Sequence, residues 1–367
     1  MPPRMTLRGT DLSVVGRTRI YVCGVTPYDV THLGHAATYV WVDAVDRVLR
    51  RLGGQVEVCR NVTDVDDVLF AAAERAGGHY EQFAAVQQFH FEQDMDRLGV
   101  RKPAHEPRAH VYIPQVIALA QSLLDQGAAY ESGGSVFLPG APVVERAGLE
   151  RDTAERLLKE YGGRLDDPDK RDPIDQAVWQ VSGEGEPAWA SPFGAPGRPG
   201  WHAECTAMAL STYGPSMDLH AGGADLRFPH HAFEAAQAEA ATGVTPFARA
   251  WMHVGIVQLE GAKMAKSVGN LVFAKDLIAQ SSPGAVRTML LDRRYDEPWD
   301  YTPELLQQAA ARNDELYKAA GTHGSSEAAW QEVLRALAND LDVRRALDIA
   351  LDEGGQVARD LTTVLAL

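Results

Sequence analysis

The sequence predicts an α/β fold of the doubly wound kind, in which parallel strands alternate with helices. The apolar run Ile20–Val25 has the composition of a buried parallel strand, and Pro27-Tyr28-Asp29 ends it. Apolar residues between Ala36 and Leu49 recur at intervals of three and four, as in an amphipathic helix. A second strand is predicted at Gln55–Arg60. This order of elements predicts a ligand crevice outside the carboxyl ends of the strands.

Composition sets the broad class of the protein. The chain has 367 residues, 45% of them hydrophobic, which is enough for two or three domains. We find no run of eighteen apolar residues and no signal-peptide core at the N-terminus, so we expect a cytoplasmic protein. A net charge of −15 argues against a large nucleic-acid-binding face. The three cysteines are too few for a disulfide framework, and Cys59 is expected in the core.

Several elements are predicted between the second strand and residue 200. The polar segment Asn61–Asp67 ends the strand and caps a helix at Val68–Gly77. Residues 81–127 read as two or three helices, and Ala129–Leu138 reads as a short hairpin or strand with a Gly133-Gly134 turn. The segment Tyr161–Gly200 has few periodic signals, which indicates an insertion between the halves of the fold.

The second half of the fold is predicted to begin at Gly200. A strand at Met217–His220 is followed by Ala221–Asp225, which we expect to be a flexible turn where backbone can approach a ligand. Trp251–Gly261 reads as a strand with a turn. From about Leu277 the pattern is helical to the end, with residues 338–342 linking the last helices.

Two histidines mark the start of the first long helix. Free backbone N–H groups and the positive end of the helix dipole favour an anion there. His32 and His35 are three residues apart, so they share a face and can add hydrogen-bond donors to that anion. Histidines at a helix start are also common as caps. A second motif, Lys263-Met264-Ala265-Lys266-Ser267, supports the anion-binding interpretation.

The pair of motifs carries a family resemblance. HLGH and KMAKS resemble the HIGH and KMSKS signatures of class I aminoacyl-tRNA synthetases, and the surrounding residues resemble the cysteine-activating branch. The resemblance covers roughly residues 18–300. It implies a Rossmann (HUP-like) nucleotide-binding fold with an inserted connective segment and a short C-terminal helical domain. The expected division is residues 1–95 and 200–275 for the two catalytic halves, 96–199 for the insertion, and 276–367 for a helical stem without an anticodon-binding domain.

Four distant residues are candidate metal ligands. Cys23, Cys205, His230 and Glu234 are of the types that suit tetrahedral zinc, and the last two are four apart on one predicted helix face. Without the resemblance, two buried cysteines and a solvated glutamate would be the simpler interpretation. The resemblance places all four at the zinc ligands of cysteinyl-tRNA synthetases. A zinc ion would bind the substrate thiolate directly and thereby distinguish cysteine from serine.

The resemblance also implies an adenylate site, with ATP as a substrate and Mg²⁺ as its companion. His32 and His35 on one side, with Lys263 and Lys266 on the other, would neutralise the phosphates. Ala265 stands where the motif usually has serine. The positions matching adenylate or substrate contacts are Cys23, Gly24, Val25, Thr26, Thr38, Asn61, Val62, Thr63, Trp201, His220, Gly223, Ala224, Asp225 and Val257. Trp201 and His220 resemble residues that close around the substrate thiol and amine.

The acceptor of the activated cysteine separates two branches of the family. Thr26-Pro27-Tyr28, Ala36-Ala37-Thr38 and the stretch Glu160–Pro168 resemble the mycothiol-pathway ligases, which join cysteine to the amine of glucosaminyl-inositol. The chain after Tyr301 is also shorter than a stem plus an anticodon-binding domain would need. We therefore expect L-cysteine, ATP and a small-molecule amine as partners of a monomer, with neither tRNA nor membrane.

Glu234 favours the other branch, because it keeps the fourth zinc ligand of the synthetases. The alternatives are therefore a cysteinyl-tRNA synthetase and a paralogue that passes cysteine to another amine in specialised metabolism. A zinc- and nucleotide-binding regulator without turnover is a third alternative, against which the intact HLGH motif and both loop lysines argue.

Overall fold

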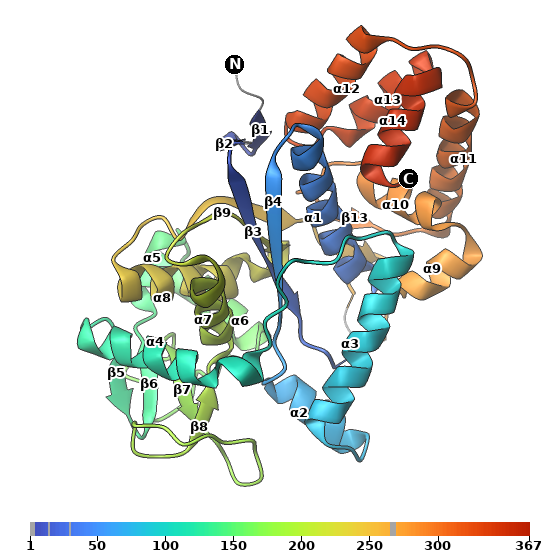
Figure 1. The fold of residues 1–367 in the computed structure, drawn as a ribbon. Coiled ribbons are helices and arrows are strands. Elements are labelled where there is room, and N and C mark those ends of the chain that lie inside the picture. Colours follow the sequence, from blue (N-terminus) through green and yellow to red (C-terminus); the bar gives the residue numbers. More distant parts are fainter. Residues whose placement is uncertain (1–3, 14, 29–30, 265–268) are drawn as a thin grey trace.

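The centre of the molecule is a parallel sheet with the strand order β10-β9-β3-β4 (Figure 1). The structure is a computed structural model that describes residues 4–13, 15–28, 31–264 and 269–367. The strands are β3 (Arg17–Val25), β4 (Gln55–Val62), β9 (Met217–Gly223) and β10 (Ala248–Val254). The predicted doubly wound α/β fold is confirmed. Because β3 and β9 come from different halves of the chain, the crevice expected at a change of strand order lies beyond their carboxyl ends.

Helices cover both faces of this sheet (Figure 1). Helix α1 (Leu33–Arg51) packs on one face, with most of its apolar side chains buried. Helices α7 (Trp201–Tyr213) and α8 (Ala232–Thr242) lie on the other side, and α7 contacts β3 and β4. The first helix is nevertheless buried well beyond one stripe, because the C-terminal helices pack against it as well as the sheet.

The strands β3 and β4 approach each other unusually closely near their carboxyl ends. A Cβ atom at Gly24 would lie 1.5 Å from the backbone oxygen of Asn61, so only glycine fits there. The Gly24 amide donates a hydrogen bond to Asn61 Oδ1 at 2.7 Å. The strand register shifts between Val22 and Val25, at the same place. This irregularity sets Cys23 and Asn61 side by side where the crevice begins.

The segment between β4 and α7 divides between two sides of the sheet (Figure 1): residues 80–97 pack on the side of α1, and residues 113–199 pack beside α7 and α8. Its helices are α2 (Asp67–Arg75), α3 (Tyr80–Arg97), α4 (Ile113–Asp125), α5 (Ala141–Arg146) and α6 (Arg151–Glu160). Its antiparallel sheet consists of β5 (Tyr130–Ser132), β6 (Ser135–Leu138), β7 (Gln176–Val181) and β8 (Gly197–Pro199). The predicted hairpin is present as β5 and β6. Strands β7 and β8 lie in the stretch with few periodic signals; β8 has only 3 residues and lies at the edge of this sheet.

The rest of the chain consists of small strands and a C-terminal group of helices. The strands are β1 (Arg4–Leu7), β2 (Thr10–Ser13), β11 (Val257–Leu259), β12 (Ala262–Lys263) and β13 (Trp299–Asp300). The helices are α9 (Ala274–Gln280), α10 (Pro283–Leu291), α11 (Pro303–Ala320), α12 (Glu327–Ala338), α13 (Val343–Glu353) and α14 (Gly355–Leu365). The link predicted at residues 338–342 lies between α12 and α13. Among the described residues, we find no helix with the length and apolarity needed to cross a membrane.

The prediction of a flexible turn at Ala221–Asp225 is wrong for residues 221–223. Strand β9 continues through Gly223, and the turn begins at Ala224. A Cβ atom at Gly222 would lie 2.9 Å from the His231 ring. Glycine at this position therefore permits close packing of β9 against a histidine, which sequence alone does not distinguish from a turn.

A buried arginine joins α1, α3 and the C-terminal helices. The Arg287 guanidinium donates to Asp43 Oδ2 at 2.7 Å, to the backbone oxygen of Leu365 at 2.7 Å, and to that of Leu98 at 2.9 Å. We expect Arg287→Ala to lower the free energy of unfolding by about 3 kcal/mol, because it leaves a buried carboxylate and two carbonyls short of donors. Chemical denaturation monitored by circular dichroism measures this change.

The matched control is Arg335→Ala, since the Arg335 side chain is 70% exposed and lies 3.8 Å from Glu332. We expect this change to stay within about 0.5 kcal/mol. Equal stabilities of the two variants would contradict the assigned role of Arg287.

Candidate active site

The two histidines of the HLGH motif lie at the start of α1, at the end of the crevice. His32 is the N-cap residue, and its Nδ1 accepts a hydrogen bond from the Gly34 amide at 3.1 Å. The His32 and His35 rings stack with centroids 3.8 Å apart. Burial, His32 and the nearby Lys263 ammonium lower the pKa of His35 well below its usual value. The His35 imidazole is therefore neutral at pH 7 and can donate one hydrogen bond from its protonated nitrogen.

Lys263 reaches the same end of the crevice from the other half of the chain. Its Nζ lies 2.9 Å from Asp225 Oδ2 and 3.4 Å from the Tyr161 hydroxyl. Although burial lowers the pKa of Lys263, the Asp225 carboxylate raises it above the usual value, so the ammonium stays charged. Two of the four expected phosphate-side residues come from each half of the chain. Lys266 and Ala265 lie outside the described residues.

The chain after the lysine motif is tied to the start of α1. The Leu33 amide donates to the Val272 oxygen at 2.8 Å, and the Ala274 amide donates to the Thr31 oxygen at 3.1 Å. These backbone bonds hold residues 272–274 beside the HLGH motif. Since Lys263 is held by Asp225, both flanks of the motif are anchored at the crevice.

The four candidate metal ligands meet in the interior between β3, α7 and α8. The ligand atoms of Cys23, Cys205, His230 and Glu234 all lie within 4.8 Å of one another, and all four residues are buried. His230 Nε2 lies 2.7 Å from Glu234 Oε1 and 3.3 Å from Cys205 Sγ. Cys23 Sγ lies 3.3 Å from the same carboxylate oxygen. The four residues that the resemblance indicated as metal ligands are therefore neighbours in space.

The donor set suits a zinc ion. In a tetrahedral zinc site with the usual bond lengths, ligand atoms are roughly 3.3 to 3.8 Å apart. The two sulfur contacts at 3.3 Å match this spacing, and the 2.7 Å contact between nitrogen and oxygen is the shorter spacing of a direct ion pair. Two sulfurs, one imidazole and one carboxylate are common zinc ligands. Zinc binding itself remains a prediction.

Charge is concentrated in this buried cluster. Against the effect of burial, His230 and His220 lower the pKa of Glu234 well below its usual value. Burial alone would lower the pKa of His230, but Glu234 and Cys205 raise it to about 10. For Cys205, burial is outweighed by the hydrogen bond with Cys23 and by His230, which bring its pKa to about 7. A deprotonated carboxylate and thiolate are the forms in which these residues bind metal.

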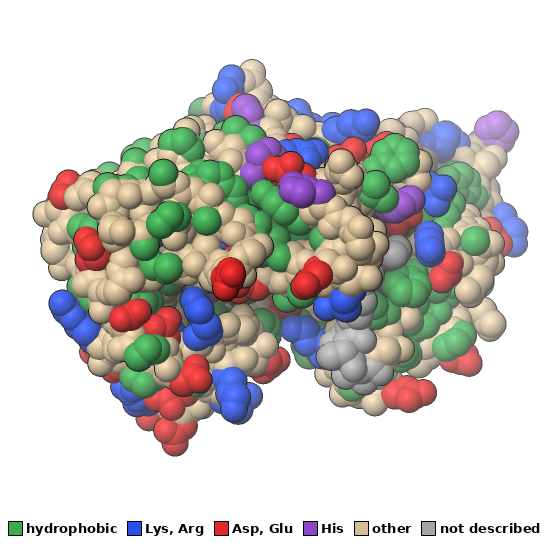
Figure 2. All heavy atoms as spheres, turned by 90° about the horizontal axis from the view of Figure 1, so that it is seen from below, with side chains coloured by type: hydrophobic (Ala, Val, Ile, Leu, Met, Phe, Trp, Pro, Cys, Tyr) green, Lys and Arg blue, Asp and Glu red, His purple; other side chains and the backbone are tan. Residues whose placement is uncertain are grey.

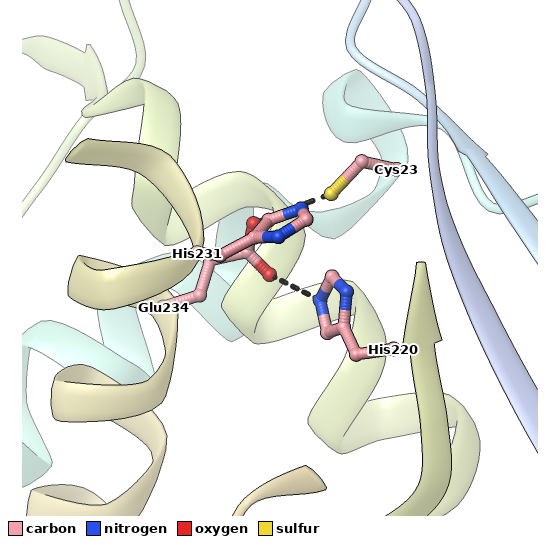
Figure 3. Close-up of side chains that lie close together, drawn as sticks. All are labelled: Cys23, His220, His231 and Glu234. Carbon is pink, nitrogen blue, oxygen red and sulfur yellow. Dashed lines mark hydrogen bonds and ion pairs between the residues drawn. The ribbon is translucent and has the colours of Figure 1, made fainter. Parts of the chain in front are cut away.

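Further histidines surround the cluster: His220, which the resemblance placed at the substrate, and His231 and His253, for which the sequence predicted no role. Cys23, His220, His231 and Glu234 form a second, overlapping group of ligand-type atoms (Figure 3). His220 Nε2 lies 2.8 Å from Glu234 Oε2. His231 Nδ1 contacts His253 Nε2 at 2.8 Å. In the sequence, the two adjacent histidines in Phe228-Pro229-His230-His231 are the feature that could have indicated a second histidine at the cluster.

The expected adenylate positions lie mostly around the ends of β3, β4 and β9. Thr26 and Thr63 share a hydrogen bond of 2.8 Å between their hydroxyls. Their neighbours on these strands are Cys23, Gly24, Val25, Asn61, Val62 and Gly223, with Ala224 and Asp225 just beyond β9. Thr38 lies on α1, Val257 on β11, and Trp201 begins α7. His220 is fully buried and pairs with Glu234, so it contacts the metal cluster from the interior of the protein. That these residues contact an adenylate remains a prediction.

The chain is similar to a known family and to named proteins. Residues 11–311 match the model for the catalytic domain of class I (C) tRNA synthetases. The chain is 44% identical, over 93% of its length and 86% of the relative, to an L-cysteine:1D-myo-inositol 2-amino-2-deoxy-alpha-D-glucopyranoside ligase of Rhodococcus jostii. It is 42% identical to the ligase of that name from Corynebacterium aurimucosum, over 95% of this chain and 86% of the relative.

Solved structures show the same fold at low sequence identity. A methionyl-tRNA synthetase of Mycobacterium tuberculosis in complex with methionyl-adenylate matches with a TM-score of 0.65 and 16% identity, covering 96% of this chain and 82% of that one. A structure described as an arginyl-tRNA synthetase of Campylobacter jejuni matches with a TM-score of 0.56 and 14% identity, covering 96% and 85%.

The metal cluster predicts a specific loss on mutation. We expect Cys205→Ser to lose bound zinc, because a serine hydroxyl stays protonated where a thiolate would coordinate. Zinc per chain, measured by mass spectrometry of the purified protein, should fall from about one to near zero. The matched control is Cys59→Ser, since Cys59 is also buried but lies outside the cluster. Equal zinc contents in the two variants would contradict this ligand set.

Proposed function

The chain belongs to the family of class I (C) tRNA synthetase catalytic domains, and we propose that it activates L-cysteine with ATP and joins it to the amine of glucosaminyl-inositol. The observation that carries the proposal is the identity of 42–44% with ligases named for this reaction over most of both chains. The protein is then an ATP-dependent, AMP-forming ligase of mycothiol biosynthesis. Residues Thr26-Pro27-Tyr28 and Glu160–Pro168 resemble those of the mycothiol-pathway ligases, which supports the same acceptor.

In the first step the cysteine carboxylate attacks the α-phosphorus of ATP, and pyrophosphate leaves. The chain contributes orientation and neutralisation of charge on the phosphates. We assign His32 and His35, at the start of α1, to hydrogen-bond donation to the phosphates. We assign Lys263 and Lys266 to neutralisation of the phosphate charge. Lys263 pairs with Asp225 at 2.9 Å, so it must exchange this partner for a phosphate when ATP binds.

We assign the side chains of Cys23, Cys205, His230 and Glu234 to a zinc ion. When bound, zinc supplies a Lewis acid that lowers the pKa of the substrate thiol and holds its sulfur. Asn61 Nδ2 donates to Cys205 Sγ at 3.2 Å, which orients that ligand and stabilises its thiolate form. Magnesium on the ATP phosphates, the monomeric state, the cytoplasmic location and the four-part domain division stay predictions.

One observation keeps cysteinyl-tRNA synthetase as the second candidate. Glu234 is fully buried and its Oε1 is shared by Cys23 and His230, so it is available as a fourth ligand in the manner of the synthetases. The two candidates share cysteine activation and differ in the acceptor.

The experiment that tests the function has two parts. Zinc-loaded protein should exchange labelled pyrophosphate into ATP when L-cysteine is present, and should form cysteinyl-glucosaminyl-inositol when that amine is added, as detected by mass. Failure of exchange would refute the enzyme. Exchange with efficient cysteinylation of tRNA, and none of glucosaminyl-inositol, would favour the second candidate.

The loop lysine gives a residue-level prediction. We expect Lys263→Ala to lower the rate of cysteine-dependent exchange by about 100-fold, the usual scale for removing one charge-stabilising group. Steady-state exchange at saturating cysteine measures this. Lys275→Ala is the control, because Lys275 is an exposed lysine on α9 after the motif, and it should stay within about twofold. Similar rates for both variants would remove Lys263 from the phosphate site.

A further inference from the structure

A cavity of about 510 Å³ lies between the catalytic sheet and the inserted segment. Thr26 after β3, Asp66 before α2 and Trp201 at the start of α7 line its sheet side. Tyr161 and Lys170, from the insertion, line the opposite side. Figure 2 views the molecule from the side of the strands' carboxyl ends, where charged side chains of both signs border a hollow. Small-molecule sites have about 300–1,000 Å³, so the cavity can hold a substrate.

The cavity adjoins both parts of the proposed adenylate site. The Trp201 ring packs on His230 of the metal cluster, with centroids 4.2 Å apart. The Tyr161 hydroxyl is 3.4 Å from Lys263 Nζ at the phosphate side. A molecule in the cavity therefore lies next to the residues assigned to the cysteine sulfur and to those assigned to the phosphates. The carbonyl of a cysteinyl adenylate joins these two parts.

Asp66 places a carboxylate at the lining of the cavity. It accepts a hydrogen bond from the Val68 amide at 2.8 Å, and within the described part of the chain it has no ion pair. Its neighbour Asp67 differs, because it pairs with Arg198 at 2.7 Å. The pKa of Asp66 is raised to about 6, because the effects of burial and of the Asp67 carboxylate outweigh those of the Val68 and Leu69 amides and of His230, which lower it. The group is mostly ionised at pH 7 and accepts a proton more readily than an ordinary aspartate.

We infer that this cavity binds the amine acceptor and that the Asp66 carboxylate pairs with the acceptor's ammonium group. The inference rests on the proposed transfer to an amine. An ammonium must give up a proton, here to Asp66, before its nitrogen can attack the cysteinyl carbonyl carbon. The C–N bond then forms and the bond from carbon to the phosphate oxygen breaks. AMP leaves with that electron pair, and its phosphate takes the second proton, which the nitrogen loses on becoming an amide.

Lys170 gives the cavity a donor for a hydroxyl-rich acceptor. Its ammonium has three N–H groups, and one of them donates to the Arg164 backbone oxygen at 2.6 Å. The remaining N–H groups can donate to sugar or inositol hydroxyls. A carboxylate at the sheet side and an ammonium at the insertion side thus match an acceptor with an amine at one end and hydroxyls at the other.

The first test is Asp66→Asn. Asparagine keeps the helix cap that Asp66 provides for α2, so folding should be retained. We expect kcat/KM for glucosaminyl-inositol to fall roughly 10- to 100-fold relative to the cysteine-dependent exchange rate of the same variant, the scale for losing a charged hydrogen bond. Asp342→Asn is the matched control, because Asp342 caps α13 in the same way, away from the cavity.

The second test obstructs the cavity without removing a charge. Val68 lines it and is 49% exposed, so Val68→Trp can be accommodated at the mouth without disturbing the core. We expect KM for glucosaminyl-inositol to rise at least about tenfold, with a smaller change in KM for cysteine. Val86→Trp, at an exposed position of α3 outside the cavity lining, is its control.

The outcomes separate this inference from the proposed function. If wild-type protein makes no cysteinyl-glucosaminyl-inositol, the proposed acceptor is wrong and the inference is overturned with it. If wild-type protein makes the product and both cavity variants match their controls in kcat/KM, the cavity assignment alone is overturned. A selective loss of transfer in both variants, with thermal unfolding unchanged, supports it.

Discussion

The buried carboxylate of Glu234 is the constraint on which the site depends. Its side chain has no exposure, and its two oxygens contact His220, His230 and Cys23. A carboxylate without partners in such surroundings would cost several kcal/mol. The partners come from β3, from β9 and from the turn that leads into α8, so balancing one charge fixes three segments relative to one another. The same balance leaves a carboxylate, a thiol and an imidazole directed at one point.

Asn61 connects the sheet to this cluster. Its amide oxygen accepts from the Gly24 backbone, and its amide nitrogen donates to Cys205 Sγ. One side chain of β4 therefore connects the backbone of β3 with a sulfur on α7. The glycine is required because any larger residue would collide with the Asn61 backbone. The irregular end of β3 thus belongs to the site, and its position follows from the close approach of the two strands.

Sequence patterns predicted the parts of the fold that depend on local order. The first helix, the hairpin at Ala129–Leu138 and the face shared by His230 and Glu234 follow from periodicity and spacing. The meeting of Cys23 with Cys205 depended on the family resemblance, since no local pattern links residues so far apart. The contact of Tyr161 with Lys263 and the pairing of His231 with His253 were missed because both join segments that fold together only in three dimensions. The glycines of β9 were misread because a turn and a tight packing contact require the same residue.

We propose that the buried cluster recognises cysteine by its sulfur. X-ray absorption at the zinc edge of zinc-loaded protein measures the sulfur atoms around the metal directly. We expect two protein sulfurs around the zinc ion, rising to three sulfurs when L-cysteine is added and staying at two with L-serine. An unchanged sulfur number with L-cysteine at saturation, or zinc without protein sulfur ligands, would contradict it.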